Sequence, residues 1–158
     1  MHKTGRTKKR RRKEGKTDYK AKISLLKSGK ARAVFRKTNR YIIGQIVKTD
    51  VAQDRVIVGI SSKNLLSLGW PENMKGKLKS LAACYLTGYM LGKKTSEKEV
   101  VLDIGFHRNI KKSRIYAFLK GLFDSGIKVS FSEEVLPSEE AIKGEKKDIF
   151  DKVKENIS

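Results

Sequence analysis

The chain has 158 residues and carries 37 lysines and arginines against 17 acidic residues, a formal net charge of +20. This length allows one domain with a sizeable core plus tails, and so basic a balance indicates a polyanionic partner. Cys84 is the only cysteine, which excludes an intrachain disulfide and a multi-cysteine zinc site and fits a reducing compartment. No signal peptide or membrane-length apolar segment is visible, so we expect a soluble, intracellular protein.

The basic charge is concentrated at the N-terminal end. Residues 1–40 contain 17 lysines and arginines against 2 acids, whereas residues 133–158 contain 5 against 8. We therefore predict a basic arm over residues 1–22, an α/β domain over residues 23–132, and an acidic, helical tail thereafter. The arm has no apolar period and cannot bury enough surface to fold by itself.

Six consecutive cations, Lys8 to Lys13, mark the arm. Such a run repels itself in isolation and is neutralised by phosphates, whose counterions it releases on binding. A nuclear-localisation signal or a membrane-surface patch has a similar composition. The arm lacks the large apolar face of a membrane-bound helix, so we expect no membrane contact. The segment Tyr19–Ser28, ended by Gly29, predicts a short helix that docks the arm through an apolar stripe including Ile23.

Three strands joined by tight turns are predicted next, over Arg32–Lys37, Tyr41–Thr49 and Arg55–Ser61. Their β-branched and aromatic content is typical of a largely buried sheet. The first turn gathers cations and hydrogen-bonding side chains at a hairpin tip, where Asn39 suits a left-handed turn position. Such a tip suits phosphates and exposed bases, with Tyr41 as a flat ring beside them. An ordinary solvated turn has the same composition.

The linker over residues 61–77 is predicted to be irregular, because it contains two glycines and a proline. Trp70 within it is either an anchor that packs the loop down or a stacking platform for a base, and we favour the anchor.

The clearest helix covers Leu78–Lys94, with Ser80 as its cap and Cys84 as a buried residue of its apolar stripe. Its small residues, including Gly88 and Gly92, are expected to let it approach the sheet closely.

A continuous apolar run over Glu99–Ile104 predicts a buried strand, and its place between two helices predicts a parallel pairing. The loop after it, residues 105–114, is rich in cations. It leaves the C-terminal end of a strand and meets the N-terminus of a helix, where free N–H groups favour anions.

The helix after this loop is predicted over Arg114–Ser125, capped by Ser113, with apolar residues through Phe123 facing the sheet. Lys128–Phe131 predicts a final short strand. A short acidic helix follows, and a last helix over Lys146–Asn156 packs on the domain, docks on a partner or frays.

The element order β-β-β-α-β-α-β predicts an α/β three-layer sandwich, with helices packed on a mixed sheet, an extended basic N-terminal arm and a C-terminal helical tail. Ribonuclease H-like nucleases share much of that order, but two-metal catalysis needs converging carboxylates. Asp103 is the only acid inside the apolar core of a predicted strand. We expect it to bond to backbone N–H groups or to a nearby cation. We therefore expect no catalytic residue, metal or cofactor.

The residues that fill this pattern resemble a known family over about residues 10–145. The likeness runs in order through RRKEGKTDYKAKISLLKSGKARAVFRKTNRYIIGQIV, ACYLTGYMLGKK and VLDIGFHRNIKKSRIYAFLKGLFDSGIKV. The family is the archaeal branch of ribosomal protein number eighteen of the large subunit, which binds 5S rRNA. The resemblance implies a protein of the cytoplasmic ribosome that helps to attach 5S rRNA to the large rRNA in the central protuberance. Its implied neighbours are the other 5S-binding ribosomal protein and further large-subunit proteins.

The residues themselves and the resemblance indicate the same three RNA-contacting regions. In the arm we expect rRNA contacts from Arg6, Lys8, Lys9, Arg10, Arg11, Arg12, Lys13, Lys16, Tyr19, Lys20 and Lys22. At the hairpin tip we expect them from Arg36, Lys37, Thr38, Asn39, Arg40 and Tyr41, and in the loop from His107, Arg108, Lys111, Lys112 and Arg114. The alternative is a basic RNA- or DNA-binding protein outside the ribosome, without selectivity for 5S rRNA.

Overall fold

The computed structural model describes residues 7–51, 53–144 and 147–157. Four strands form one sheet in the order β3-β2-β1-β4. Their bounds are β1 Ala31–Lys37, β2 Ile42–Asp50, β3 Gln53–Ser61 and β4 Val100–Asp103. The first three strands pair antiparallel, whereas β4 lies parallel to β1. The sheet is therefore mixed, as predicted, and β4 returns to the edge beside the first strand after a crossover through a helix.

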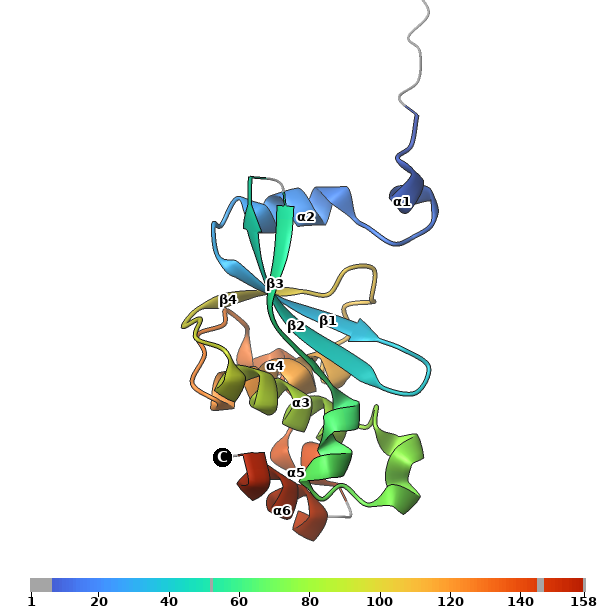
Figure 1. Ribbon diagram of the computed structural model, residues 1–158, viewed down its shortest axis with the longest axis vertical. Coiled ribbons are helices and arrows are strands. Elements are labelled where there is room, and N and C mark those ends of the chain that lie inside the picture. Colours follow the sequence, from blue (N-terminus) through green and yellow to red (C-terminus); the bar gives the residue numbers. More distant parts are fainter. Residues whose placement is uncertain (1–6, 52, 145–146, 158) are drawn as a thin grey trace, which may run out of the picture.

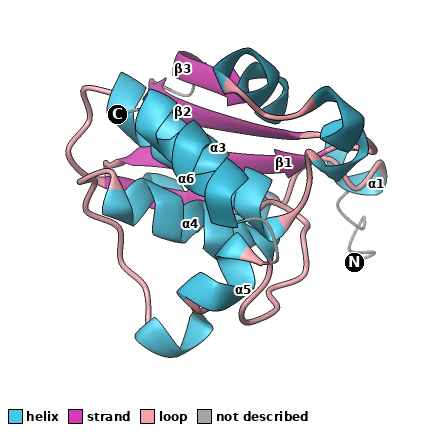
Figure 2. Ribbon diagram, turned by 90° about the horizontal axis from the view of Figure 1, so that it is seen from below, coloured by secondary structure: helices cyan, strands magenta, loops and turns pink. Residues whose placement is uncertain are grey.

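Helices lie on both sides of this sheet, which confirms the three-layer arrangement. Their bounds are α1 Arg10–Lys13, α2 Tyr19–Leu26, α3 Leu81–Lys94, α4 Arg114–Asp124, α5 Glu139–Lys143 and α6 Lys147–Ile157. Figure 1 shows α2 on one side of the sheet and α3 and α4 on the other, and Figure 2 shows α3 and α4 in front of the strands. None of the helices in the described part of the chain is long and apolar enough to cross a membrane.

Strand β1 separates the two sides of the sheet by the alternation of its side chains. Ala33 and Phe35 are buried in the apolar core, where the Phe35 ring lies 5.4 Å from that of Phe118 in α4. Arg32, which precedes Ala33 and points to the opposite face, is also buried but is bonded to polar groups. One face of the strand therefore packs against helices and the other carries a charged cluster.

Glycines bring α3 and α4 into backbone contact. A Cβ atom at Gly88 would lie 2.1 Å from the carbonyl oxygen of Phe118, and one at Gly121 would lie 2.1 Å from that of Tyr85. A Cβ at Gly92 would meet the Ser125 side chain. Gly88 and Gly92 of α3 therefore face α4. The expectation that the small residues of α3 let it approach the sheet is wrong for these two glycines.

The predicted cap and buried cysteine of α3 are confirmed. The Ser80 hydroxyl accepts a hydrogen bond from the Ala83 N–H at 3.3 Å, and the helix starts at Leu81. Cys84 is fully buried, and this burial raises the pKa of its thiol to about 12. A thiol that stays protonated at neutral pH is a poor nucleophile, so Cys84 is a core residue.

Residues Lys128–Phe131 do not form the predicted last strand. Lys128 makes one isolated parallel bridge to Glu99, and the chain then leaves the sheet. Phe131 packs edge-on against Phe123, with ring centroids 5.0 Å apart. The prediction that Phe123 faces the sheet is also wrong, because this side chain is 49% exposed. The two phenylalanines contact each other outside the sheet, which draws the chain away from the edge of β4.

The linker contains two 3₁₀ helices, η1 Ser62–Leu68 and η2 Glu72–Lys77, so the prediction of irregular structure is wrong there. Gly69 ends η1 with a φ of 99°, a conformation that glycine adopts without strain. Trp70 is buried and its indole N–H donates to the Met74 carbonyl at 3.2 Å. The anchor interpretation of Trp70 is therefore confirmed.

The C-terminal helix α6 packs on the domain. Phe150 and Val153 are buried, and the Phe150 ring lies 5.3 Å from that of Tyr85 in α3. The Asn156 side chain also donates to the Leu68 carbonyl of η1 at 2.9 Å. Of the three outcomes expected for this helix, packing on the domain is the one observed. The predicted first residue of the helix, Lys146, lies outside the described residues.

Candidate nucleic-acid interface

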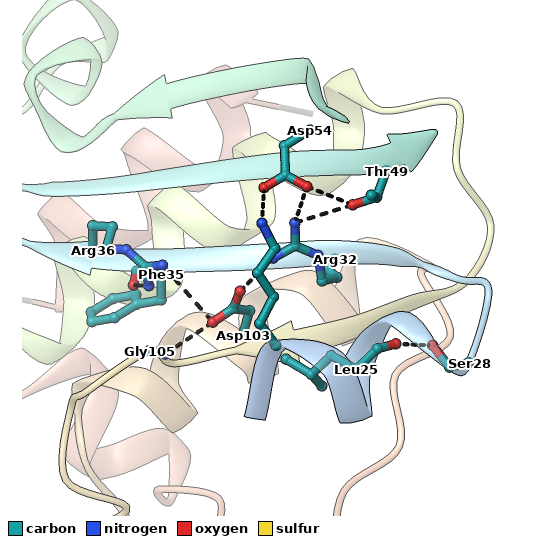
Figure 3. Close-up of polar contacts among 10 residues, drawn as sticks. Leu25, Ser28, Arg32, Phe35, Arg36, Thr49, Asp54, Asp103 and Gly105 are labelled. Carbon is teal, nitrogen blue, oxygen red and sulfur yellow. Dashed lines mark hydrogen bonds and ion pairs between the residues drawn. The ribbon is translucent and has the colours of Figure 1, made fainter. Parts of the chain in front are cut away.

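A buried arginine organises the polar face of the sheet (Figure 3). The Arg32 guanidinium donates to Asp103 at 2.7 Å and to Asp54 at 2.9 Å, and its side chain is only 4% exposed. Asp103 also accepts a hydrogen bond from the Gly105 N–H at 2.9 Å. The expectation for Asp103, backbone N–H groups or a nearby cation, is confirmed on both counts. Among the described residues, no group of three histidine, cysteine or acidic side chains could hold a metal.

The same cluster holds helix α2 against the sheet. Lys22 donates to Asp54 at 2.6 Å, and Thr49 donates to the same carboxylate at 2.6 Å. Burial by itself would raise the pKa of Asp54. The hydrogen bonds from Lys22 and Thr49 and the charges of Arg32 and Lys22 outweigh burial and lower that pKa from 3.8 to about 2. Asp54 therefore stays charged at neutral pH and links the helix to the strand.

The short helix predicted here is confirmed as α2, but the prediction that it docks through a buried apolar stripe is wrong. None of its residues is buried, and Ile23 is 57% exposed. The reason is the surface that α2 meets, because an apolar stripe gains little against a face that carries Arg32 and its carboxylates. Ion pairs with Asp54 and Asp18 hold this segment instead.

Asp18 connects α2 with the rest of the arm. It caps the helix by accepting from the N–H groups of Lys20 and Ala21, and it pairs with Arg12 at 2.8 Å. The hydrogen bond from Ala21, followed by the Arg12 charge and the other bonds, lowers the pKa of Asp18 despite desolvation. Lys9 lies over the Tyr19 ring, 4.5 Å from its centroid. The short helix α1 is thereby held beside the start of α2 with its cations exposed.

A threonine closes the hairpin tip. The Thr38 hydroxyl donates to the Tyr41 carbonyl at 2.7 Å and accepts from the Tyr41 N–H at 3.1 Å. The prediction of a left-handed Asn39 is wrong, since Val51 and Lys112 are the only non-glycine residues with positive φ in the described part of the chain. The bonds from Thr38 close the turn without a left-handed residue.

His107 joins the loop to the hairpin tip. Its Nε2 accepts a hydrogen bond from the Lys37 N–H at 3.4 Å, and its ring packs edge-on against Phe35, with centroids 5.7 Å apart. Burial, and then the charges of Arg36 and Lys37, lower the pKa of His107 below its usual value. A neutral imidazole keeps the acceptor atom that this contact needs.

The loop reaches α4 without the predicted cap. Ser113 makes no capping hydrogen bond, and its hydroxyl oxygen is buried without a partner among the described residues. The preceding residue, Lys112, has a φ of 57°, and its N–H donates to the Val135 carbonyl at 2.8 Å. That contact fixes the backbone just before the helix, whose N-terminus is not capped by the Ser113 side chain.

The arm also meets the loop. The Arg12 guanidinium lies 5.4 Å from the centroid of the Phe106 ring. In Figure 1, α1, the turn between β1 and β2, and the loop after β4 lie on the same side of the molecule. We call this surface the basic edge: the described arm (residues 7–22), the hairpin tip (residues 36–41) and the loop (residues 105–114).

Most of the expected site residues in the described part of the chain are accessible on this edge. The exposed ones are Lys8, Lys9, Arg10, Arg11, Arg12, Lys13, Lys16, Lys20, Lys37, Asn39, Arg40, Arg108, Lys111, Lys112 and Arg114. Tyr19, Lys22, Arg36, Thr38, Tyr41 and His107 are partly buried. Among these, Lys22 is paired with Asp54, and Tyr41 lies under Lys63. Arg6 lies outside the described residues.

Sequence reasoning missed the two residues that organise this edge. Arg32 is buried in β1, and its charge at an inward position of an apolar strand was the available signal. Phe106 is 46% exposed beside cations, and its place in the cation-rich loop was the available signal. Asp54 precedes the predicted third strand, Arg55–Ser61, but in the structure it lies within β3 and completes the cluster.

Comparison with known proteins places the chain in a family. A family model described as "Ribosomal large subunit proteins 60S L5, and 50S L18" matches residues 3–99. The chain is 50% identical over 139 residues to large ribosomal subunit protein uL18 of Korarchaeum cryptofilum, covering 86% of this chain and 69% of that protein. The uL18 proteins of Methanothermobacter thermautotrophicus and Aeropyrum pernix are each 42% identical over 86% of this chain, covering 70% and 64% of their own lengths.

The family model matches more than half of this chain, and this chain matches more than two thirds of the length of the first two relatives. The match includes the arm, the hairpin tip and the whole of the first three strands. This chain belongs to the L5/L18 family of large ribosomal subunit proteins.

Proposed function

We propose that the basic edge binds 5S rRNA and helps to attach it to the large rRNA of the central protuberance. As a member of its family, the chain is a structural, non-catalytic constituent of the large ribosomal subunit and associates with rRNA in the cytoplasmic ribosome. The choice of 5S rRNA goes further and rests on the resemblance described above. The observation that supports it is the convergence of three cationic segments on one rigid edge.

The physical basis is that charge supplies affinity for RNA and the fixed arrangement of the cations supplies selectivity. Lysine and arginine contacts with phosphates supply affinity that depends on salt but carries little sequence information. Selectivity for one folded RNA then requires that the cations be held in fixed relative positions. The bond between Lys37 and His107 fixes the tip against the loop, and the pairs formed by Lys22 and Arg12 fix the arm.

The proposal extends to individual residues and partners. All the rRNA-binding residues predicted from the sequence remain in it, with Lys22 acting mainly through its pair with Asp54. Residues 1–22 act as the rRNA-binding arm, residues 23–132 as the 5S-binding domain, and residues 133–158 as a separate tail. The proposed protein neighbours are the other 5S-binding ribosomal protein and adjoining large-subunit proteins.

A competition titration tests this function. Labelled 5S rRNA bound to the full chain is challenged at roughly physiological salt, where non-specific contacts are weakened, with unlabelled 5S rRNA or with tRNA. We expect 5S rRNA to displace the label at much lower concentration than tRNA. Equal displacement by tRNA would contradict the proposal and favour a basic nucleic-acid binder without 5S selectivity.

A further inference from the structure

A groove of about 620 Å³ lies where the loop meets α4. Its apolar lining includes Phe35, Phe106, Ile110 and Ile115. Two of these side chains face solvent to an unusual degree, since Phe106 is 46% and Ile110 is 57% exposed. Exposure of a large apolar side chain to water does not stabilise the fold. Such a side chain among cations instead offers a surface on which a ligand can pack.

The rest of the groove is positively charged. Lys37, Arg108 and Arg114 line it, and its described lining contains no carboxylate. The N-terminus of α4 borders the groove, and the Ser113 side chain does not cap it. Ser113 also lines the groove, and its buried hydroxyl oxygen has no partner among the described residues. Free N–H groups, the helix dipole and the surrounding cations together favour an anion.

A nucleotide combines a flat, largely apolar base with an anionic phosphate a few bonds away. In a nucleotide, the base stacks on aromatic side chains and the phosphate bonds to cations and helix N-termini. A base inside a duplex is unavailable for this, because both of its faces are covered by its neighbours. The groove therefore fits a nucleotide that is unstacked, as in loops and bulges of folded RNA.

We propose that this groove binds one unstacked nucleotide of RNA, with its base against Phe106 and Ile110 and its phosphate at Arg108, Arg114 and the N-terminus of α4. The proposal rests on the function proposed above and deepens it. It turns the loop from a general phosphate-binding segment into a site that recognises a local RNA structure. Arg12, which lies over the Phe106 ring, brings the arm to the same place.

The first test uses the full chain without 5S rRNA. Backbone amide shifts of the ¹⁵N-labelled protein are followed by NMR during titration with adenosine monophosphate, with inorganic phosphate, and with a short acidic peptide containing phenylalanine. We expect the nucleotide to shift the amides of residues 106–115 more strongly than phosphate does. Equal shifts from phosphate would overturn the proposal in favour of an anion site, and stronger shifts from the peptide would indicate a protein-binding groove. No shift in this segment would also overturn it.

The second test uses Phe106→Ala, with Val56→Ala as a matched control, since Val56 is 50% exposed on β3 and does not line the groove. We expect Phe106→Ala to abolish the excess shift from the nucleotide and to weaken 5S rRNA binding by roughly 5- to 150-fold, the range for loss of one base stack. The control should leave both unchanged. Unaltered 5S binding by Phe106→Ala would overturn this inference while 5S selectivity over tRNA could still hold, whereas loss of that selectivity in the unmodified chain would overturn the proposed function itself.

Discussion

The two faces of strand β1 are built on different principles. On one face, Phe35 packs against Phe118, and the helices behind it touch backbone to backbone at Gly88 and Gly121. On the other face, Arg32 joins carboxylates from two strands, and α2 is held by ion pairs without burying any residue. The apolar face makes a rigid scaffold, and the polar face positions the cationic arm on it.

This difference explains how the arm can remain available to RNA. An apolar docking face would remove side chains of α2 from solvent, whereas ion pairs hold its backbone near the sheet and leave α1 exposed. A buried ion pair adds little net stability, because desolvating its charges offsets most of their attraction. We infer that the Arg32 cluster contributes the position of the arm more than the stability of the domain.

The largest effect is expected from breaking the polar cluster on one side. Asp103→Ala leaves the Arg32 guanidinium partly uncompensated in a site where its side chain is 4% exposed. The free energy of unfolding should fall by about 3–5 kcal/mol, as measured by urea denaturation. The control is Arg32→Met with Asp103→Leu, which removes both charges and should retain most of the stability. A loss below about 1 kcal/mol for Asp103→Ala would show that the cluster is not a buried ion network.

The next effect concerns the arm and RNA. Deletion of residues 1–16 removes α1 but leaves α2 and its pair with Asp54. If the six cations Lys8 to Lys13 each neutralise a phosphate, the full chain has a log–log salt slope steeper by about four to five. Titrations of 5S rRNA at several salt concentrations measure it. An unchanged slope, or unfolding of the truncated chain, would contradict the division into arm and domain.

A matched pair of glycine substitutions sharpens the description of the apolar face. Gly121→Ala places a Cβ atom 2.1 Å from the Tyr85 carbonyl oxygen, so α3 and α4 must separate, and the loss in free energy of unfolding should be about 1–3 kcal/mol. The same change at Gly76, where no atom of the described residues lies within 4 Å of the added Cβ, should alter the free energy of unfolding by less than about 0.5 kcal/mol. Equal thermal denaturation midpoints for the two variants would contradict the close helix crossing.

The smallest effect is the pH dependence from Asp54. Because its pKa is lowered to about 2 in the folded chain from an ordinary 3.8, the unfolded chain binds the proton more readily. Its stabilising effect is therefore complete above about pH 4 and is lost as the pH falls towards 2. The difference in free energy of unfolding between the unmodified chain and Asp54→Asn should shrink over this interval. A difference that stays constant would show that Asp54 is not the linked group.

The sequence predicts the apolar face better than the polar one. The first three strands, the helix cap at Ser80 and the buried anchor Trp70 follow from local patterns, because burial and capping depend on nearby residues. The Arg32 cluster does not, since Asp54 and Asp103 lie far apart in the chain and meet only when β1 pairs with β4 and β2 with β3. The orientation of Phe123 also escaped prediction, because its helical position fits the apolar stripe but its contact with Phe131 depends on the path of the later chain.

For the basic edge, the sequence predicts which segments carry the cations, and the structure shows how these segments lie relative to one another. Lysine and arginine clusters are visible in any sequence, but the bond between His107 and Lys37, which joins two of them, spans 70 positions of the chain. The groove at Phe106 likewise combines β1, α3 and α4 side chains.

The most direct measurement of the central claim compares two triple charge reversals. In the first variant Lys37, Arg40 and Arg108 become glutamate. The control reverses three exposed lysines away from the basic edge, Lys94, Lys147 and Lys152, so the net charge changes equally. Both are titrated with 5S rRNA at the same salt concentration. Our account predicts that the edge variant loses at least about tenfold more affinity than the control, since bound phosphates contact the edge directly. Equal losses would show that general electrostatic attraction, and not the basic edge, binds the RNA.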